Sequence, residues 1–185
     1  MYDIHLLFPT PILVSKYNTN IQQFIQYAYQ VKEQHQSTQL SNRKGYQSPL
    51  LDIALTLPLR DRVDSILKEI TSKKVEHHQQ WININQTGAY NSTHTHPQSD
   101  YSVVYYLQND NTAICFNHPD MHSAYNTIAF LHDNVGDQLR LSPQFRTVPR
   151  AGDLYIFPAY VPHSVDENTS TKDRISIAWN VSLHT

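Results

Sequence analysis

Residues 81–107, WININQTGAYNSTHTHPQSDYSVVYYL, decide the fold of this chain. β-branched and aromatic residues open the stretch, and residues 101–107 form an apolar, aromatic run that is typical of a buried strand. A polar turn between them carries His94 and His96. The stretch therefore predicts two strands joined by a turn that presents two histidines.

These two histidines are separated by one residue, so on extended chain their side chains point to the same side of the sheet. Taken alone, they could equally be polar residues of a solvated turn. A later segment, 152–163 (GDLYIFPAYVPH), predicts a strand that ends in a proline-framed turn and a third histidine, His163. Three neutral imidazoles on one face bind a transition metal and leave its opposite coordination positions open. We therefore expect His94, His96 and His163 to be metal ligands.

Length and composition predict one domain. The 185 residues are 39% hydrophobic and 16% charged, enough for a sizeable core. We expect strands and supporting helices over residues 1–74 and a β-core over residues 75–185. The formal net charge of -2 gives no electrostatic reason to expect nucleic acid or an anionic membrane as a partner.

The sequence also predicts a cytoplasmic protein. No apolar run approaches the ~18 residues of a membrane span, and the first residues lack the basic region and cleavage site of a secretory signal. The one cysteine, Cys115, cannot form an internal disulfide, and we interpret it as a buried thiol in a reducing compartment.

The first 74 residues predict short strands and two helices. Two prolines interrupt the extended segment 4–17, which suits an edge strand or a bend. A helix with one apolar face is expected over 20–35, a loop over 36–49, and a second helix over 58–72 that begins with a proline in its first turn.

After residue 74 the pattern becomes a series of short strands separated by turns rich in Asn, Asp, Gly and Pro. Two helices followed by many short strands predict a mainly β fold, a jelly roll with the helices packed on one face. The expected strands are 75–86, 101–108, 112–117, 126–131, 144–148, 153–157, 162–166 and 174–183.

Arg174 and Ser176 begin the last strand and point to the same face of it. A buried arginine needs a partner, and a planar guanidinium beside a hydroxyl suits bidentate binding of a carboxylate. The alternative is an edge arginine in water, or in a structural ion pair with Asp153 or Asp173.

The order of these motifs, His94-x-His96, YYL, GDLYIFP, His163 and Arg174-x-Ser176, resembles the 2-oxoglutarate- and iron(II)-dependent oxygenases. The resemblance is to the small group with an HxHP…VYYL segment and a RISI strand, and it covers about residues 80–182. It implies a double-stranded β-helix that holds Fe(II) and 2-oxoglutarate.

The resemblance also implies roles for further residues. Arg174 would bind the distal carboxylate of 2-oxoglutarate, helped by Ser176 and a tyrosine of the Tyr105–Tyr106 pair. In the related prolyl hydroxylases the second tyrosine does this, which favours Tyr106. The implied reaction uses O2 to hydroxylate an unactivated C–H bond of an amino-acid, peptidyl or small-metabolite substrate, and releases succinate and CO2. No catalytic residue beyond the metal ligands is implied.

The sequence departs from this family at His96, where the family has a carboxylate. Either all three histidines bind the iron, or His96 does not coordinate it and a water molecule fills the ligand position of the missing carboxylate. Asp100 could supply a carboxylate, although a turn-capping role is the preferred interpretation.

Two other readings remain open. Gly88, followed after five residues by His94-x-His96, is similar to the first cupin motif, and the segment from Gly152 to His163 resembles the second. Tyr160, in place of a glycine, departs from that pattern. A cupin-type metalloprotein would use the same histidines without 2-oxoglutarate, and it does not require Arg174-x-Ser176, which the 2-oxoglutarate enzymes do. The third reading is a non-catalytic jelly-roll binding module.

Pocket residues are less well defined by the sequence. Trp81, Asn83, Asn85 and Asn180 are candidates, although each could be an ordinary strand residue. The polar insertion 117–137 is a candidate substrate loop. The oligomeric state is left open, a homodimer included.

Overall fold

The last strand shows how alternating side chains build the two layers of this protein. In β11 (Arg174–His184), Ile175, Ile177 and Trp179 are buried in the larger hydrophobic core. Arg174 and Ser176, on the opposite face of the strand, line an internal cavity. One face of the strand therefore packs into the hydrophobic core and the other lines the cavity, which agrees with the alternation in its sequence.

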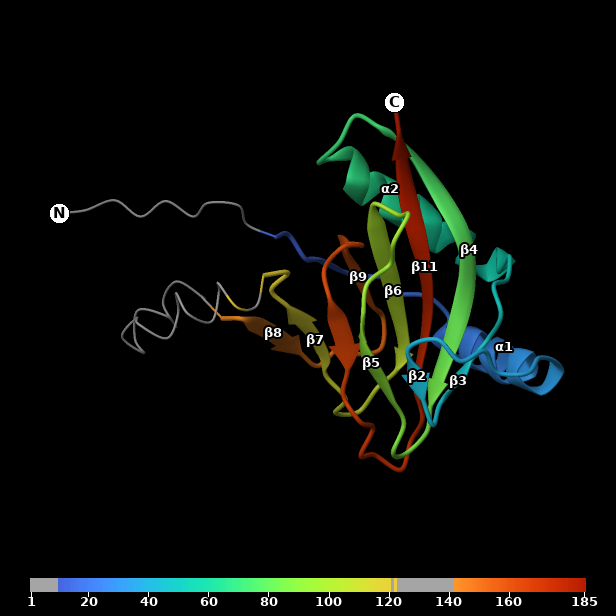
Figure 1. Cartoon of the computed structure of the whole chain (residues 1–185). Coiled ribbons are helices and arrows are strands. Elements are labelled where there is room, and N and C mark those ends of the chain that lie inside the picture. The colour runs from blue at the N-terminus through green and yellow to red at the C-terminus, as the bar shows by residue number, and fades with distance from the viewer. Residues whose placement is uncertain (1–9, 121, 123–141) are drawn as a thin grey trace.

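The computed structural model describes residues 10–120, 122 and 142–185, and within them it forms two antiparallel sheets (Figure 1). The larger sheet has the order β1-β9-β6-β11-β4-β3, and the smaller has the order β2-β5-β10-β7-β8. The strands of the larger sheet are β1 (Leu13–Lys16), β9 (Asp153–Pro158), β6 (Tyr101–Gln108), β11, β4 (Lys74–Asn85) and β3 (Tyr46–Gln47). Those of the smaller sheet are β2 (Asn42–Arg43), β5 (Tyr90–His94), β10 (His163–Val165), β7 (Ile114–Asn117) and β8 (Gln144–Thr147).

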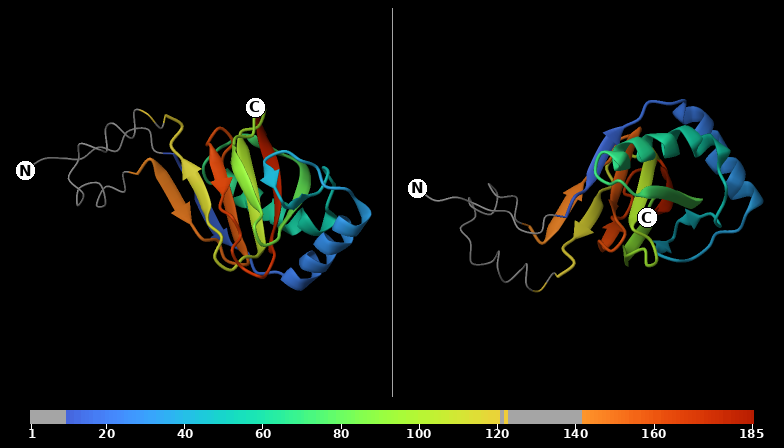
Figure 2. Two further views of the ribbon diagram at one scale, coloured as in Figure 1. Left: turned by 60° about the horizontal axis from the view of Figure 1, so that its bottom comes forward. Right: turned by 90° about the horizontal axis from the view of Figure 1, so that it is seen from above.

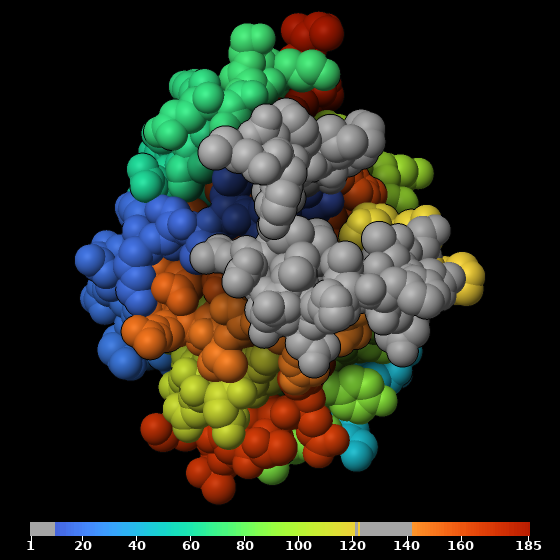
Figure 3. Space-filling model, turned by 90° about the vertical axis from the view of Figure 1, so that its left-hand side faces the viewer, coloured from blue at the N-terminus to red at the C-terminus, as the bar shows by residue number. Residues whose placement is uncertain are grey.

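Two helices cover the outer face of the larger sheet (Figure 2). Apolar residues three or four positions apart form the buried stripe of each helix, which is the spacing that places side chains on one helical face. In α1 (Ile21–Gln34) these are Phe24, Ala28 and Val31, and in α2 (Leu57–Lys68) they are Leu59, Val63 and Leu67. In the space-filling view of Figure 3, the blue and green surfaces of the two helices lie on the same flank of the molecule. The predicted packing of both helices on one face is confirmed.

A short corner between β2 and β3 joins the edges of the two sheets. β2 pairs with β5 of the smaller sheet, and β3 pairs with β4 of the larger. Gly45 lies at this corner, where an added Cβ would come within 3.3 Å of the Asn85 side chain. The sequence predicted only a loop over 36–49, so the two short strands are a correction. They were missed because two-residue strands carry no periodic pattern.

Most other elements agree with the prediction, and β1 is indeed an edge strand. β5 was missed, because its residues YNSTH are polar and were interpreted as a turn. α2 ends at Lys68, before the predicted residue 72. The expected strand 126–131 and most of the expected substrate loop 117–137 lie outside the described residues. No helix in the described part of the chain is long and apolar enough to cross a bilayer.

Candidate metal centre

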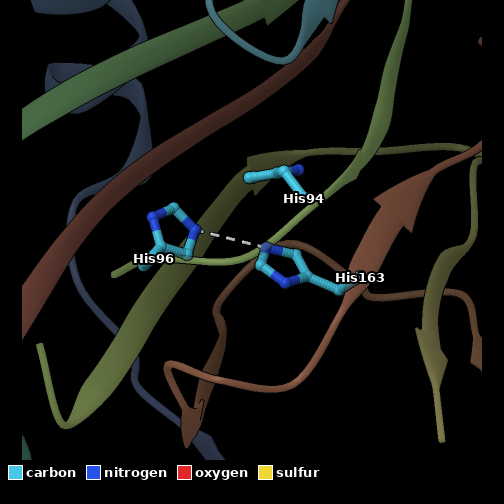
Figure 4. Close-up of side chains that lie close together, drawn as sticks. All are labelled: His94, His96 and His163. Atoms are coloured by element: carbon cyan, nitrogen blue, oxygen red, sulfur yellow. Dashed lines mark hydrogen bonds between the residues drawn. The ribbon is translucent and has the colours of Figure 1, made fainter. Parts of the chain in front are cut away.

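Three histidines that lie far apart in the sequence point toward one another in the jelly roll (Figure 4). Their ligand nitrogens all lie within 4.8 Å of one another. His94 ends β5 and His163 begins β10, and these two residues are directly opposite each other in the antiparallel pair. His96 follows β5, and its backbone N–H donates to the carbonyl of Ala159 at 2.9 Å. The predicted triad therefore converges on one point.

Two of the histidines are held in the orientation that metal binding requires. Nδ1 of His94 donates to the carbonyl of Ser92 at 2.9 Å, and Nδ1 of His163 donates to the carbonyl of Val161 at 3.0 Å. A carbonyl only accepts, so Nδ1 carries the proton in both rings and Nε2 keeps a free lone pair. Such carbonyl contacts fix the tautomer and direction of metal-binding histidines.

His96 is held differently. In the described part of the chain, no carbonyl accepts a hydrogen bond from its ring. Its Nε2 lies 3.3 Å from Nε2 of His163, and its ring packs against Trp81 with 5.6 Å between centroids. Ring packing restricts the plane of the imidazole but leaves the tautomer free. His96 is therefore the least firmly oriented of the three histidines.

Burial keeps these rings neutral. Burial first, and the neighbouring His94 second, lower the pKa of His163 to about 3 and that of His96 to about 4. Burial also lowers the pKa of His94. The neutral imidazole is the form that binds a metal, because the lone pair is then available.

We expect the metal-free protein to lose stability as the pH falls from 6.5 toward 4. In the unfolded chain these rings take up protons near pH 6.5, whereas His96 and His163 in the folded protein do so only near pH 4 and pH 3. The unfolded state therefore binds more protons in this window, and the free energy of unfolding should fall by about 2 kcal/mol or more by pH 5. Urea unfolding at several pH values measures this, and His163→Asn should flatten the slope. An unchanged slope in that variant would contradict the assignment.

A second group of polar side chains lies beside the histidines, in the inner cavity, and lacks partners. Arg174 is 4% exposed, and its guanidinium carbon lies 5.3 Å from the centroid of the Tyr106 ring. Within residues 10–120, 122 and 142–185, Nε and Nη1 of Arg174, Oγ of Ser176 and the hydroxyl of Tyr106 make no hydrogen bond. Burial raises the pKa of Tyr106, against the effect of the Arg174 charge, so the hydroxyl keeps its proton.

These unpaired groups are costly unless something binds them. Arg174, Ser176 and Tyr106 line the same cavity as His94 and His163. A carboxylate can accept from a guanidinium, a serine hydroxyl and a tyrosine hydroxyl at once. The residues present therefore fit a carboxylate that reaches inward from the metal position.

The prediction for Tyr105 is corrected by the structure. Its side chain points to the other face of β6, where its hydroxyl donates to the carbonyl of Tyr17 at 3.0 Å and its ring packs against Phe24. Adjacent strand residues face opposite sides, so Tyr105 and Tyr106 cannot share one cavity. Tyr106 alone lies beside Arg174.

An outer cleft of about 690 Å³ opens onto His94 and His96. Trp81 and Asn180 line it, whereas Asn83 lines the inner cavity. Asn85, the fourth predicted pocket residue, lines neither space, and its Nδ2 donates to Oδ1 of Asn91 at 3.1 Å. Asp100 is exposed, and its carboxylate accepts from the backbone N–H of Leu183 in β11 at 2.7 Å, a contact with another strand rather than with its own turn.

The sequence reasoning missed the part of the site built by the β2–β3 corner. Ser41 lines both the inner cavity and the outer cleft. Its hydroxyl accepts from Nδ2 of Asn91 at 3.1 Å, and its backbone carbonyl accepts from the backbone N–H of Ser92 at 2.9 Å. This contact depends on β2 lying next to β5, which no local pattern in residues 36–49 reveals.

Comparisons with known proteins agree with this geometry. The model of the family described as "Putative 2OG-Fe(II) oxygenase" matches residues 79–180, more than half of the chain. This match confirms the resemblance seen in the sequence. A search of the curated proteins finds no match.

Solved structures of the same architecture are similar over most of this chain. The α-ketoglutarate-dependent epimerase SnoN from nogalamycin biosynthesis is 12% identical, with a TM-score of 0.68 over 94% of this chain and 78% of that one. A Pseudomonas putida prolyl-4-hydroxylase is 13% identical, with a TM-score of 0.61 over 94% and 93%. HygX from Streptomyces hygroscopicus, with nickel and 2-oxoglutarate bound, is 10% identical, with a TM-score of 0.60 over 94% and 83%. At such identities the likeness shows the fold, and the predicted double-stranded β-helix is confirmed.

Proposed function

The chain belongs to the 2OG-Fe(II) oxygenase family, and on that premise we propose that it hydroxylates an unactivated C–H bond, using O2 and releasing succinate and CO2. Fe(II) and 2-oxoglutarate are the cofactors of this family. The observation that carries the proposal is the buried guanidinium of Arg174, which has unpaired nitrogens beside the three histidines. A cupin-type metalloprotein does not require a buried, unpaired guanidinium, which costs free energy of folding.

The histidines and the unpaired polar residues beside them then each have one task. His94, His96 and His163 would hold the iron, His94 and His163 through Nε2. Arg174 forms a bidentate pair with the distal carboxylate of 2-oxoglutarate, and Ser176 and Tyr106 donate their hydroxyl hydrogens to the same group. Their near-complete burial excludes water from this end of the cavity.

When bound, iron, 2-oxoglutarate and O2 together supply the oxidising equivalents for attack on a C–H bond. The protein side chains contribute by position, because a hydrogen on unactivated carbon offers no acid–base chemistry to assist. Trp81 and Asn180 line the outer cleft, and their proposed role is to orient the target carbon toward His94 and His96.

The outer cleft supports an amino-acid, peptidyl or small-metabolite substrate. Its volume of about 690 Å³ is that of an ordinary small-molecule site. Solved structures similar to this chain include a prolyl hydroxylase in complex with a peptide and an antibiotic-pathway epimerase. Since one of these is an epimerase, the test of hydroxylation is whether ¹⁸O from ¹⁸O2 enters the product.

We expect a visible charge-transfer band when the protein is titrated anaerobically with Fe(II) and then with 2-oxoglutarate. This band requires both cofactors at one centre, so it tests the proposal before any substrate is known. Iron binding without the band would favour the cupin-type metalloprotein. Failure to bind iron would favour a non-catalytic jelly-roll module and contradict the proposed function.

A further inference from the structure

The walls of the outer cleft carry no acidic or basic side chain. Apart from the histidines of the metal centre, the polar residues that line it in the described part of the chain bear amides and hydroxyls. The cations of the adjacent corner, Arg43 and Lys44, do not line it, and Nη1 of Arg43 donates to the carbonyls of Leu40 and Asn42 at 2.9 Å. A free amino acid would bring a carboxylate and an ammonium into this cleft. Neither charge would meet an opposite one there, so the loss of their hydration would not be compensated.

Gln47, in β3, is the most buried residue of the cleft wall, at 5% exposed. Its backbone N–H donates to Oγ of Ser37 at 3.1 Å, and its carbonyl accepts from the backbone N–H of Thr38 at 2.8 Å. Within the described part of the chain, its side-chain amide makes no hydrogen bond. A buried amide without a partner is costly. The fold therefore fixes the backbone of Gln47 and leaves its amide for a ligand.

A second unpaired amide lies directly opposite Gln47. Asn83 is the register partner of Gln47 across β3 and β4 and of Ser176 across β4 and β11, so the three side chains share one face of the sheet. Asn83 is 7% exposed, lines the inner cavity, and has no partner for its Oδ1 among the described residues. This polar row leads from the cleft to the position proposed for 2-oxoglutarate. A group bound by Gln47 is therefore held at the cleft end of that row.

The ligand that fits an amide differs from the one that fits a charge. An amide accepts through its oxygen and donates through its nitrogen, and a peptide group can satisfy both, whereas a carboxylate only accepts and an ammonium only donates. Leu40 and Leu50, which are 71% and 61% exposed, also line the cleft and offer apolar contacts to neighbouring side chains of a peptide. A carbohydrate could pair with the amides, but its hydroxyls would leave these leucines without an apolar contact.

From these observations we propose that the substrate is a residue within a peptide chain, not a free amino acid, and that Gln47 determines this specificity by pairing with a peptide group beside the reacting residue. The proposal rests on the proposed function and names the substrate class of the same site. A residue in peptide linkage has no charged amino or carboxyl group of its own, so it enters the cleft without leaving a charge unpaired.

The test compares matched compounds on the protein loaded with Fe(II) and 2-oxoglutarate in the presence of O2. Each standard amino acid is supplied free, and also with an N-acetyl and a C-terminal N-methylamide cap, which replace both charges by peptide groups and keep the side chain. The measured quantity is succinate released above the level without added compound. At least one capped compound is expected to stimulate this release, and its free amino acid about tenfold less or weaker still.

Stimulation by a free amino acid equal to that by its capped form overturns the inference. So does the absence of stimulation by any capped compound while the charge-transfer band with Fe(II) and 2-oxoglutarate forms. Absence of the band itself would instead contradict the proposed function.

Variants at Gln47 test its assigned role. Gln47→Leu removes the amide at similar volume and should lower the stimulation by the capped compound about tenfold, with 2-oxoglutarate affinity retained. Because the amide has no protein partner, thermal stability should be unchanged or higher. Gln47→Glu, which introduces a charge at nearly the same shape, should also lose stimulation. The matched control is Gln79→Leu, since Gln79 is exposed, lines neither space, and contacts Asp52 through Nε2 at 3.2 Å. Undiminished stimulation in both Gln47 variants, or a loss of stability in Gln47→Leu, overturns the assignment of this residue.

Discussion

We expect the replacement of His163 by alanine to abolish metal binding. His163 is the most buried of the three histidines, and its Nδ1 contact with Val161 directs Nε2 toward the other two. Its ring is also wedged against Phe157, with 4.7 Å between centroids. Loss of an outer hydrogen-bond partner alone costs about 10- to 100-fold in metal affinity, so loss of the ligand itself should cost more.

The measurement is anaerobic equilibrium dialysis against Fe(II), with thermal unfolding as a check on the fold. Truncation to alanine leaves a cavity beside Phe157, so His163→Asn, which keeps more of the volume, provides a second variant. The matched control is His118→Ala, because His118 is exposed and its Nδ1 contacts the backbone of Asp120 rather than the triad. Undiminished iron affinity in both His163 variants would remove this residue from the site.

We expect the replacement of Arg174 by alanine to keep the metal but to weaken 2-oxoglutarate binding by about 100-fold. A hydrogen bond to a charged group contributes about 1.5–3 kcal/mol, and a bidentate guanidinium makes two of them. The iron ligands come from other strands, so iron affinity should be unchanged. The charge-transfer band then appears only at much higher 2-oxoglutarate concentration.

The same variant separates binding from folding. Arg174 has unpaired buried nitrogens, so its removal should leave the stability of the protein free of 2-oxoglutarate unchanged or raise it. Arg174→Lys should recover only part of the affinity, because an ammonium lacks the planar fork. Arg146→Ala is the matched control, since Arg146 is exposed and paired with Asp166. Full 2-oxoglutarate affinity in Arg174→Ala would contradict the assignment.

How far the sequence predicts this site depends on whether a residue belongs to a periodic strand. Alternation along 174–183 correctly placed Arg174 and Ser176 together, and the same rule separates Tyr105 from Tyr106. By contrast, β5 was not predicted, because its polar residues pack beside the cleft rather than in the core.

Contacts between segments far apart in the chain were not predictable from one sequence. The convergence of His94 and His163 depends on the pairing of β5 with β10, and the part played by Ser41 depends on the pairing of β2 with β5. Neither pairing has a local signature. The resemblance to a family predicted that His94 and His163 meet. No feature of the sequence predicted the contact of Ser41 with β5.

The corner between β2 and β3 has a consequence for how this protein could diversify. One continuous piece of chain, residues 39–50, contributes a wall of the outer cleft, whereas the three histidines come from β5, β10 and the turn after β5. This wall of the cleft is thus encoded apart from the three histidines, whereas Trp81, Asn180 and the residues next to His94 and His96 form the rest of it. Insertions or exchanges within 39–50 would reshape what enters the cleft while the metal ligands are inherited intact, which makes this segment the natural place to graft a new specificity.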